Sequence, residues 1–499
     1  MKLPKSFYSW TSIAGAALAA ISLLLIIFMM LISFIFGQGD NYSGLFTYII
    51  LPVFLIIGLV MIPLGAIRKM KEAKKQTDEE QTKFPVVNLN EPVQRKAVII
   101  FIVGSAVFLL LSAIGSYEAF HYSESVEFCG KLCHQVMKPE YVAYQNSSHA
   151  RVTCVTCHVG SGAGWYVKSK MSGLYQVYAV TMGIYPKPIP IPISNLRPAR
   201  ETCEQCHWPE KFYSRKLISK RHYLADEANT EWDINLNIKT GPTMSALGLK
   251  EGIHWHINPD VKIEYIATSA KRDTIPWVRY TNLKTNESFV YEDTDYPLGD
   301  IEKYKDQIRT MDCIDCHNRP SHHYRYPVHF VDDAITAGKI SKELPEIKML
   351  CMQILSNKFT TTDSAMAFIE NEILDFYNSG YPEIMNEKKD LVTNAITALQ
   401  SEFQKNIFPE MGVTWDVYPS FLGHVETVGC DRCHNERHLN AENRVISRDC
   451  NLCHEISAQG PPDSIQMATT FKGLEFRHPV DIDDEWKVTL CSECHHELY

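Results

Sequence analysis

Charged side chains are missing from three long stretches in the first quarter of this 499-residue chain. Residues 12–36, 45–67 and 97–117 contain no Asp, Glu, Lys or Arg. Each stretch is long enough to cross a bilayer as a helix, which buried helices of a soluble core seldom match. Pro52 and Pro63 fall in the second stretch, where neighbouring helices can accommodate a kink. We therefore expect three transmembrane helices and exclude a wholly soluble protein.

Positive charge is missing from the first of the two connecting loops. Residues 37–44 contain no Lys or Arg, whereas residues 68–96 contain eight. Short basic loops stay in the cytoplasm. The sequence thus predicts a multi-pass protein of a bacterial inner membrane, with the N-terminus and loop 68–96 in the cytoplasm and residues after about 118 in the periplasm. No small-residue cleavage site follows the first stretch, so we expect a retained helix rather than a removed signal peptide.

Basic residues are also too few in the exported part, residues 118–499, to balance the acidic ones. The chain has ten Lys/Arg and six Asp/Glu before residue 118, but 39 and 52 after it, which leaves the exported part at −13. Such a domain repels phosphate backbones, which argues against nucleic acid as a partner. It favours a protein partner with a positive surface, mainly through the rate of encounter.

Cysteine outside paired motifs is nearly absent. Fourteen of the fifteen cysteines fall in pairs followed at once by His, a feature that neither zinc sites nor disulfides require. Two thiols one turn apart can each bond one edge of a porphyrin while the adjacent imidazole reaches the iron. Six pairs have the C-x-x-C-H spacing of c-type haem attachment: Cys154/Cys157/His158, Cys203/Cys206/His207, Cys313/Cys316/His317, Cys430/Cys433/His434, Cys450/Cys453/His454 and Cys491/Cys494/His495.

A seventh pair, Cys129 and Cys133 followed by His134, has one extra residue between its cysteines and stands just after the third apolar stretch. We expect it to carry a haem near the membrane surface, for seven covalent haems c in all. The fifteenth cysteine, Cys351, lies in the apolar run MLCMQIL and is interpreted as a buried structural thiol.

Twelve histidines remain to bind the opposite faces of the irons. Closed electron-transfer haems generally take two imidazoles, so about six of the twelve should be ligands. His323 competes with its neighbour His322, His121 is expected to be structural, and His329 and His496 are weaker candidates. The candidate ligands are His149, His222, His254, His256, His322, His424, His438 and His478.

The fold is expected to be mainly α-helical and irregular, with three transmembrane helices followed by a multihaem cytochrome c domain with a minor β element. Alternating segments within 208–312 predict a hairpin, and apolar residues at helical spacing within 331–406 predict helices. The predicted regions are a membrane domain, 1–117; a domain with the first three haems, 118–207; a linker with the hairpin and the fourth haem, 208–330; a helical insert, 331–406; and a C-terminal domain with three haems, 407–499.

Residues 129–170, CGKLCHQVMKPEYVAYQNSSHARVTCVTCHVGSGAGWYVKSK, follow an apolar helix and hold two motifs, a nearby Met and an S-x-H. The segment resembles the NapC/NirT/NrfH family of membrane-anchored multihaem quinol dehydrogenases. With three spans and seven motifs, the whole chain is most similar to the ImcH-type inner-membrane cytochromes of metal-reducing bacteria.

The resemblance implies that the first haem accepts electrons from menaquinol. It implies Met137 as an axial ligand of that haem, but both spacings differ from the family pattern, so His134 remains the rival. A family lysine of the quinol site corresponds to Lys170, with Lys168 as the alternative. The family carboxylate that follows has no counterpart, since Tyr175 and Gln176 stand in that region.

The sequence therefore predicts a menaquinol dehydrogenase that passes electrons to periplasmic c-type cytochromes, for anaerobic or extracellular metal respiration. One alternative is a haem wire that takes electrons from another protein and never oxidises quinol. Another is a terminal oxyanion reductase, which the absence of a C-x-x-C-K motif and the acidic surface disfavour. Besides quinol and cytochromes, membrane lipid is the expected partner.

Overall fold

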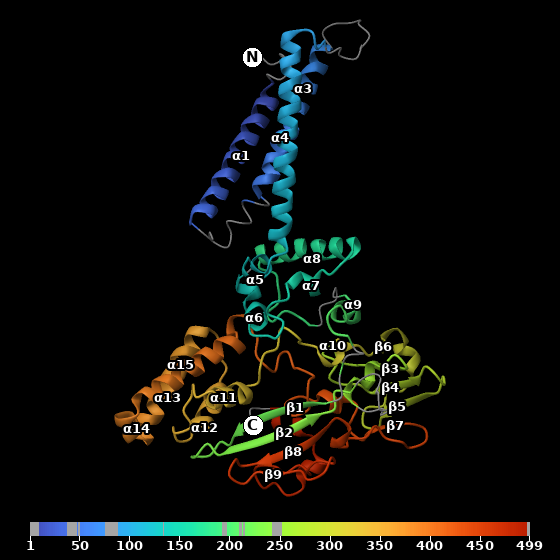
Figure 1. The fold of residues 1–499 in the computed structure, drawn as a ribbon, viewed down its shortest axis with the longest axis vertical. Coiled ribbons are helices and arrows are strands. Elements are labelled where there is room, and N and C mark those ends of the chain that lie inside the picture. Colours follow the sequence, from blue (N-terminus) through green and yellow to red (C-terminus); the bar gives the residue numbers. More distant parts are fainter. Residues whose placement is uncertain are drawn as a thin grey trace. The chain divides into compact units, whose positions relative to one another are not determined.

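The computed structural model describes residues 9–36, 47, 50–74, 88–132, 134–191, 197–208, 212, 215–241 and 252–496. The chain forms two compact units, Met1–Met137 and Lys138–Tyr499 (Figure 1). The predicted loop 37–44, much of loop 68–96, Cys133 and the side chain of His134 lie outside the described residues.

Within the described part of the first unit, three helices are long and apolar enough to cross a membrane: α1 (Trp10–Phe36), α3 (Leu51–Lys74) and α4 (Pro92–Ser123). They confirm the expected three candidate spans. Helix α4 extends beyond the predicted 97–117 at both ends, because the polar residues that flank the apolar stretch continue the helix. Helix α3 starts at Leu51, and most of 45–50 lies outside the described residues.

Small residues let α1 and α3 pack closely. A Cβ added to Gly58 would lie 2.7 Å from the carbonyl oxygen of Gly15, so the two backbones meet at this point. Nearby, the Ser12 hydroxyl donates to the carbonyl of Ile62 at 2.9 Å. Glycine and serine at a helix interface are typical of membrane helices, where close packing and interhelical hydrogen bonds replace the hydrophobic effect.

The second unit contains the predicted helical region as α11 (Pro327–Thr336), α12 (Ile347–Leu355), α13 (Thr362–Gly380), α14 (Pro382–Glu387) and α15 (Lys389–Asn406). Apolar side chains at helical spacing meet in one core that excludes water. Its fully buried members include Phe330, Ile347, Cys351, Ile369, Tyr377, Leu399 and Phe403.

The described residues contain two antiparallel sheets, and both are larger than the single hairpin expected. One has the order β1-β2-β8-β9, formed by β1 (Lys216–Tyr223), β2 (Glu231–Ile238), β8 (His454–Gly460) and β9 (Gln466–Met467). The other has the order β6-β3-β4-β5-β7, with bounds Arg309–Thr310, Val261–Ile266, Trp277–Asn282, Ser288–Asp293 and His438–Leu439.

The remaining helices lie at or near the cysteine motifs. They are α5 (Val126–Lys131), α6 (His134–Gln145), α7 (Cys154–His158), α8 (Ala163–Thr181), α9 (Ala199–Cys203), α10 (Cys313–Cys316), α16 (Glu485–Val488) and α17 (Cys491–His495). Most of the haem-motif region is thus built from single helical turns joined by irregular chain, which the two sheets and the α11–α15 core hold in place.

Candidate functional site

A helical turn shapes the cysteine motifs. The backbone N–H of His207 donates to the carbonyl of Cys203 at 2.8 Å, and His317 and Cys313 repeat this bond at 2.8 Å. The turn brings the two thiols to the same side and sets the histidine directly after them. Motifs five and six form 3-10 turns instead, at Gly429–Arg432 and Cys450–Leu452.

Six motif histidines each face a second histidine. An imidazole nitrogen binds a first-row metal at about 2 Å, so two imidazoles on opposite sides of one iron have ring centres about 6 Å apart. The observed ring-centre distances are 6.2 Å for His158–His322, 5.9 Å for His149–His207, 6.4 Å for His254–His317, 5.9 Å for His256–His434, 6.2 Å for His424–His454 and 6.1 Å for His478–His495. The side chains therefore fit bis-imidazole iron at six motifs.

Hydrogen bonds at Nδ1 orient five of the six partner histidines. The Nδ1 atoms of His254, His256 and His478 lie 2.8, 2.7 and 2.7 Å from backbone carbonyl oxygens. Those of His149 and His322 lie 3.2 and 3.0 Å from such oxygens. A carbonyl only accepts, so Nδ1 carries the proton and the Nε2 lone pair is left to bind a metal, as is usual for histidine ligands.

Burial favours the neutral form of four of the paired histidines. It lowers the pKa of His158, His256 and His322 below the usual value for histidine, and it lowers the pKa of His454 to about 4. Only the neutral ring binds a metal, so no proton has to be displaced from these side chains near pH 7.

Among the described side chains, which do not include that of His134, two candidate ligands have no motif histidine as a ring neighbour. His438 is fully buried, with Nδ1 3.0 Å from Asn435 Oδ1 and Nε2 2.7 Å from the carbonyl oxygen of Ile275. Both nitrogens are engaged, so its place corrects the expected ligand role to a structural one. His222 directs Nδ1 to Asp332 at 3.1 Å, and its ring lies 6.4 Å from that of His329, which follows no motif.

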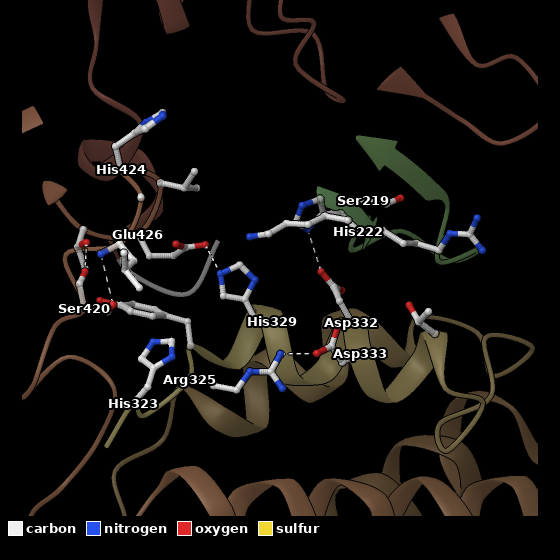
Figure 2. A pocket seen from close by; sticks show the side chains of 18 of the residues that line it. Ser219, His222, His323, Arg325, His329, Asp332, Asp333, Ser420, His424 and Glu426 are labelled. Atoms are coloured by element: carbon white, nitrogen blue, oxygen red, sulfur yellow. Dashed lines mark hydrogen bonds and ion pairs between the residues drawn. The ribbon is translucent and has the colours of Figure 1, made fainter. Parts of the chain in front are cut away.

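A cavity of about 570 Å³ lies beside His222, with His323, His329 and Glu426 in its walls (Figure 2). Burial opposes ionisation of Glu426, but the hydrogen bond from His329 at 2.7 Å lowers the pKa of that carboxyl to about 2. Burial, aided by the nearby Arg325, lowers the pKa of His323 to about 4. His323 thus faces this cavity, and its neighbour His322 is the one that meets a motif histidine.

The thiols of the second, third and fourth motifs lie close to one another. Burial raises the pKa of Cys157, and Cys203 of the third motif adds to this effect. A hydrogen bond with Cys203 raises the pKa of Cys313 in the fourth motif. The thiols of Cys157, Cys203 and Cys313 thus influence one another although they belong to three different motifs.

The same order continues to the end of the chain. Burial raises the pKa of Cys316 to about 11, with Cys430 of the fifth motif contributing. Burial and Cys430 likewise raise the pKa of Cys453 in the sixth motif to about 11. At the seventh motif, burial raises the pKa of Cys491, and Asp431 of the fifth motif and Cys450 of the sixth contribute to this shift. Each of motifs two to six thus has the next motif in the sequence as a neighbour, and the fifth motif also lies near the seventh.

Five of the predicted attachment cysteines are exposed: Cys157, Cys206, Cys430, Cys450 and Cys494. Cys206 and Cys494 differ in this from the partly enclosed first cysteines of their motifs, Cys203 and Cys491. Both motifs are short turns with little chain packed over them, and α17 buries only Ser492 among its residues. Cys206 is nevertheless held in its turn, because its N–H donates to the carbonyl of Cys203 at 3.1 Å. The packing around Cys206 and Cys494 therefore gives no support for haem attachment. Their role as attachment residues stays a prediction from the motif spacing.

The candidate quinol-site residues lie on α8. Lys170 Nζ lies 5.1 Å from the centre of the Tyr166 ring, and Lys168 Nζ lies 4.8 Å from that of Trp165. Gln176 is exposed, with Nε2 3.4 Å from the Ser172 hydroxyl. Met137 is half-buried on α6, one turn beyond His134, and Cys129 is near the end of α5.

Residues 91–188 match the model of the NapC/NirT cytochrome c family, N-terminal region. The whole chain is 42% identical to the cytochrome c-type protein ImcH of Geobacter sulfurreducens, over 98% of this chain and 95% of that protein. The chain belongs to the NapC/NirT family of multihaem c-type cytochromes. It is also 31% identical to NrfH of Wolinella succinogenes, over 30% of this chain and 86% of that protein. No solved structure matches it.

Membership of the NapC/NirT family implies covalently attached haem c, and the paired histidines above show that this chain's side chains fit it. Sequence reasoning missed the side chains that hold the motifs together. Buried Asp315 caps α10 in a capping box with Asp312 and accepts from Tyr265 at 2.7 Å and Arg309 at 2.8 Å. The D-x-x-D spacing was a usable signal for that box.

Arg432, between the cysteines of the fifth motif, fastens that motif to the fourth. Its guanidinium donates to the carbonyl of Asp315 at 2.7 Å and to that of Gly429 at 2.8 Å, and it lies 3.9 Å from the centre of the Phe421 ring. An arginine that donates to several fixed carbonyls and stacks on an aromatic ring is geometrically specific. No sequence signal pointed to it, because Asp315, the partner in the fourth motif, lies 117 residues away along the chain.

Proposed function

We propose that this protein is a menaquinol dehydrogenase of a bacterial inner membrane. It oxidises menaquinol at the membrane and passes electrons through seven covalently bound haems c to periplasmic c-type cytochromes. This activity would serve anaerobic or extracellular metal respiration. The NapC/NirT family is linked to quinol oxidation and electron transfer, which supports the assignment.

The observation that carries the proposal is the order of the motifs in space. Motifs two to seven are neighbours in their sequence order, and each of their histidines faces a second imidazole at about 6 Å. When bound, haem c takes up and gives off one electron at a time with little change in its surroundings. A succession of neighbouring closed sites suits conduction, whereas a terminal reductase needs an open iron position.

The protein's own residues hold that row rigid. Backbone carbonyls fix the ring orientation of the partner histidines, such as His254 and His478. Arg432 and Asp315 tie the fourth motif to the fifth. Fixed ligands mean that little rearrangement accompanies a change of charge, which favours fast electron transfer.

Menaquinol must lose two protons and two electrons to become menaquinone. We assign Lys170 the task of donating a hydrogen bond from Nζ to a quinol oxygen, where negative charge develops as the proton leaves. Its partly buried position on α8, a helix with no carboxylate, supports this role. Lys168 and Gln176 are the alternatives, and Met137 or His134 is the proposed ligand at the first motif.

A haem wire that takes electrons from another protein is the second candidate, and the motif order supports it equally. The two differ in one respect: only a quinol dehydrogenase is reduced by menaquinol without a further protein. Mixing the purified chain with a menaquinol analogue without oxygen separates them.

Haem stoichiometry tests the foundation of the proposal. Intact mass should show seven covalent haems, which add about 4.3 kDa to the 57.0 kDa chain. Cys351→Ala should retain all seven, because Cys351 is buried in the helical core, and should lower the free energy of unfolding by only about 1 kcal/mol. A mass with six haems in the wild type would mean that Cys129 and Cys133 carry none, and the membrane-face site would fail.

A further inference from the structure

One segment of the acidic exported part of the chain contains no acidic residues. Residues 141–200 contain no Asp or Glu, although residues 118–499 as a whole carry a net charge of −13. The same sixty residues contain six basic ones: Arg151, Lys168, Lys170, Lys187, Arg197 and Arg200. Charge is thus sharply segregated, and helix α8 lies in the middle of the basic part.

Helix α8 and its C-cap residue Met182 expose a continuous row of large apolar side chains. Val167, Met171, Leu174, Tyr178 and Met182 follow at intervals of four, three, four and four residues, which places them on one face. They are 60, 63, 64, 53 and 59% exposed, respectively. Single exposed apolar residues are ordinary, but a row of this length marks a surface that meets an apolar partner.

Contacts on both sides of α8 hold the helix against the rest of its unit. Its apolar row is therefore exposed on a helix that is packed in place. Before α8, Arg197 donates to the carbonyl of Ser161 at 2.7 Å and stacks on Trp165 at 5.8 Å. After α8, the Tyr418 hydroxyl donates to the carbonyl of Ile189 at 2.5 Å. Within its unit, α8 lies at the end remote from the β1-β2-β8-β9 sheet (Figure 1).

Lysines flank the apolar row on both sides. At 100° per residue, Lys168 lies on one side of the row and Lys170 on the other. Their Nζ atoms fold back toward Trp165 and Tyr166. Lysines beside an apolar face, with aromatic rings at the same level, are typical of helices that lie in a membrane interface.

We propose that α8 lies flat in the surface of the bilayer, with its apolar row among the upper acyl chains and Lys168 on anionic phospholipid headgroups, while Lys170 is left to the quinol. The three candidate spans of the same chain keep it at a membrane, and the basic acid-free segment complements anionic lipid. A second copy of the chain fits less well, because lysines on both faces would repel. The proposal goes beyond quinol oxidation, since it concerns how the domain is held.

Photo-crosslinking to lipid tests this directly. Full-length, haem-loaded protein is placed in nanodiscs that contain a phospholipid with a diazirine in its acyl chain, and adducts are mapped by mass spectrometry. We expect adducts on 163–182, with a yield that rises with the fraction of phosphatidylglycerol and falls with added salt. Leu174→Glu should lower that yield at least about threefold.

Leu217→Glu on β1 is the matched control, since Leu217 is 66% exposed and lies in the sheet. It should leave the adducts on α8 unchanged, and unchanged reduced visible spectra would show that both variants fold. Adducts on α1, α3 and α4 without any on α8 would overturn the proposal. So would unchanged labelling of Leu174→Glu, or α8-to-α8 cross-links in place of lipid adducts. None of these readouts requires quinol, so they stand apart from the proposed activity.

Discussion

Lys170→Ala should slow reduction of the haems by a menaquinol analogue while leaving reduction by dithionite nearly unchanged. The substitution removes one hydrogen bond to an oxygen on which negative charge develops, a loss that typically costs about 2–4 kcal/mol or 10²–10³ in rate. Lys170 is only partly buried, so water can replace the lysine in part. We therefore expect the lower end of that range, measured by stopped-flow absorbance without oxygen.

Lys168→Ala is the matched control for Lys170. The two lysines lie on the same helix and each contacts an aromatic ring, but residues two apart do not share a face. The control should oxidise quinol at nearly the wild-type rate. If neither substitution slows quinol oxidation, the assignment of this lysine is incorrect, and the site has to be sought around Gln176 or among the membrane helices.

His254→Met should raise the reduction potential of one haem, on the order of 0.1 V, without loss of covalent haem. His254 faces His317 at 6.4 Å, and a Met/His ligand pair holds iron at a higher potential than two imidazoles. The raised site would trap an electron in the middle of the row and slow transfer from the first motifs to the last. A spectroelectrochemical titration measures the potential, and intact mass checks the haem count.

His438→Gln is the control for this substitution. His438 is as near to a motif in sequence as several paired histidines, but both of its nitrogens are bonded inside the protein. Loss of these buried hydrogen bonds should lower the free energy of unfolding by about 1–3 kcal/mol and leave every potential in place. A shifted potential in His438→Gln, or none in His254→Met, would contradict the pairing of ligands.

Local sequence patterns predicted much of the fold. The apolar stretches gave α1, α3 and α4, and helical spacing within 331–406 gave α12, α13 and α15. The sheets were underestimated, because β2 pairs with β8 more than two hundred residues away. Periodicity reports which face of a strand is buried and says nothing about a distant partner.

The sequence also could not predict which histidine faces each motif histidine, because these partners too are distant along the chain. His254 and His256 are two residues apart, yet they face His317 and His434 of different motifs. The 3-10 turn Ile253–Ile257 explains this, since residues two apart in such a turn project in different directions. Likewise, the choice of His322 over His323 depends on the distant Glu140 carbonyl that holds its Nδ1.

Reduction of the purified protein by a menaquinol analogue tests the central claim most directly. The oxidised, full-length chain in nanodiscs is mixed with the quinol without oxygen, and the haem absorbance is followed against quinol consumed. We predict reduction without any further protein, with one quinol consumed for every two haems reduced, since each quinol yields two electrons. Haems that dithionite reduces but the quinol leaves oxidised would contradict the claim and leave a wire fed by another protein.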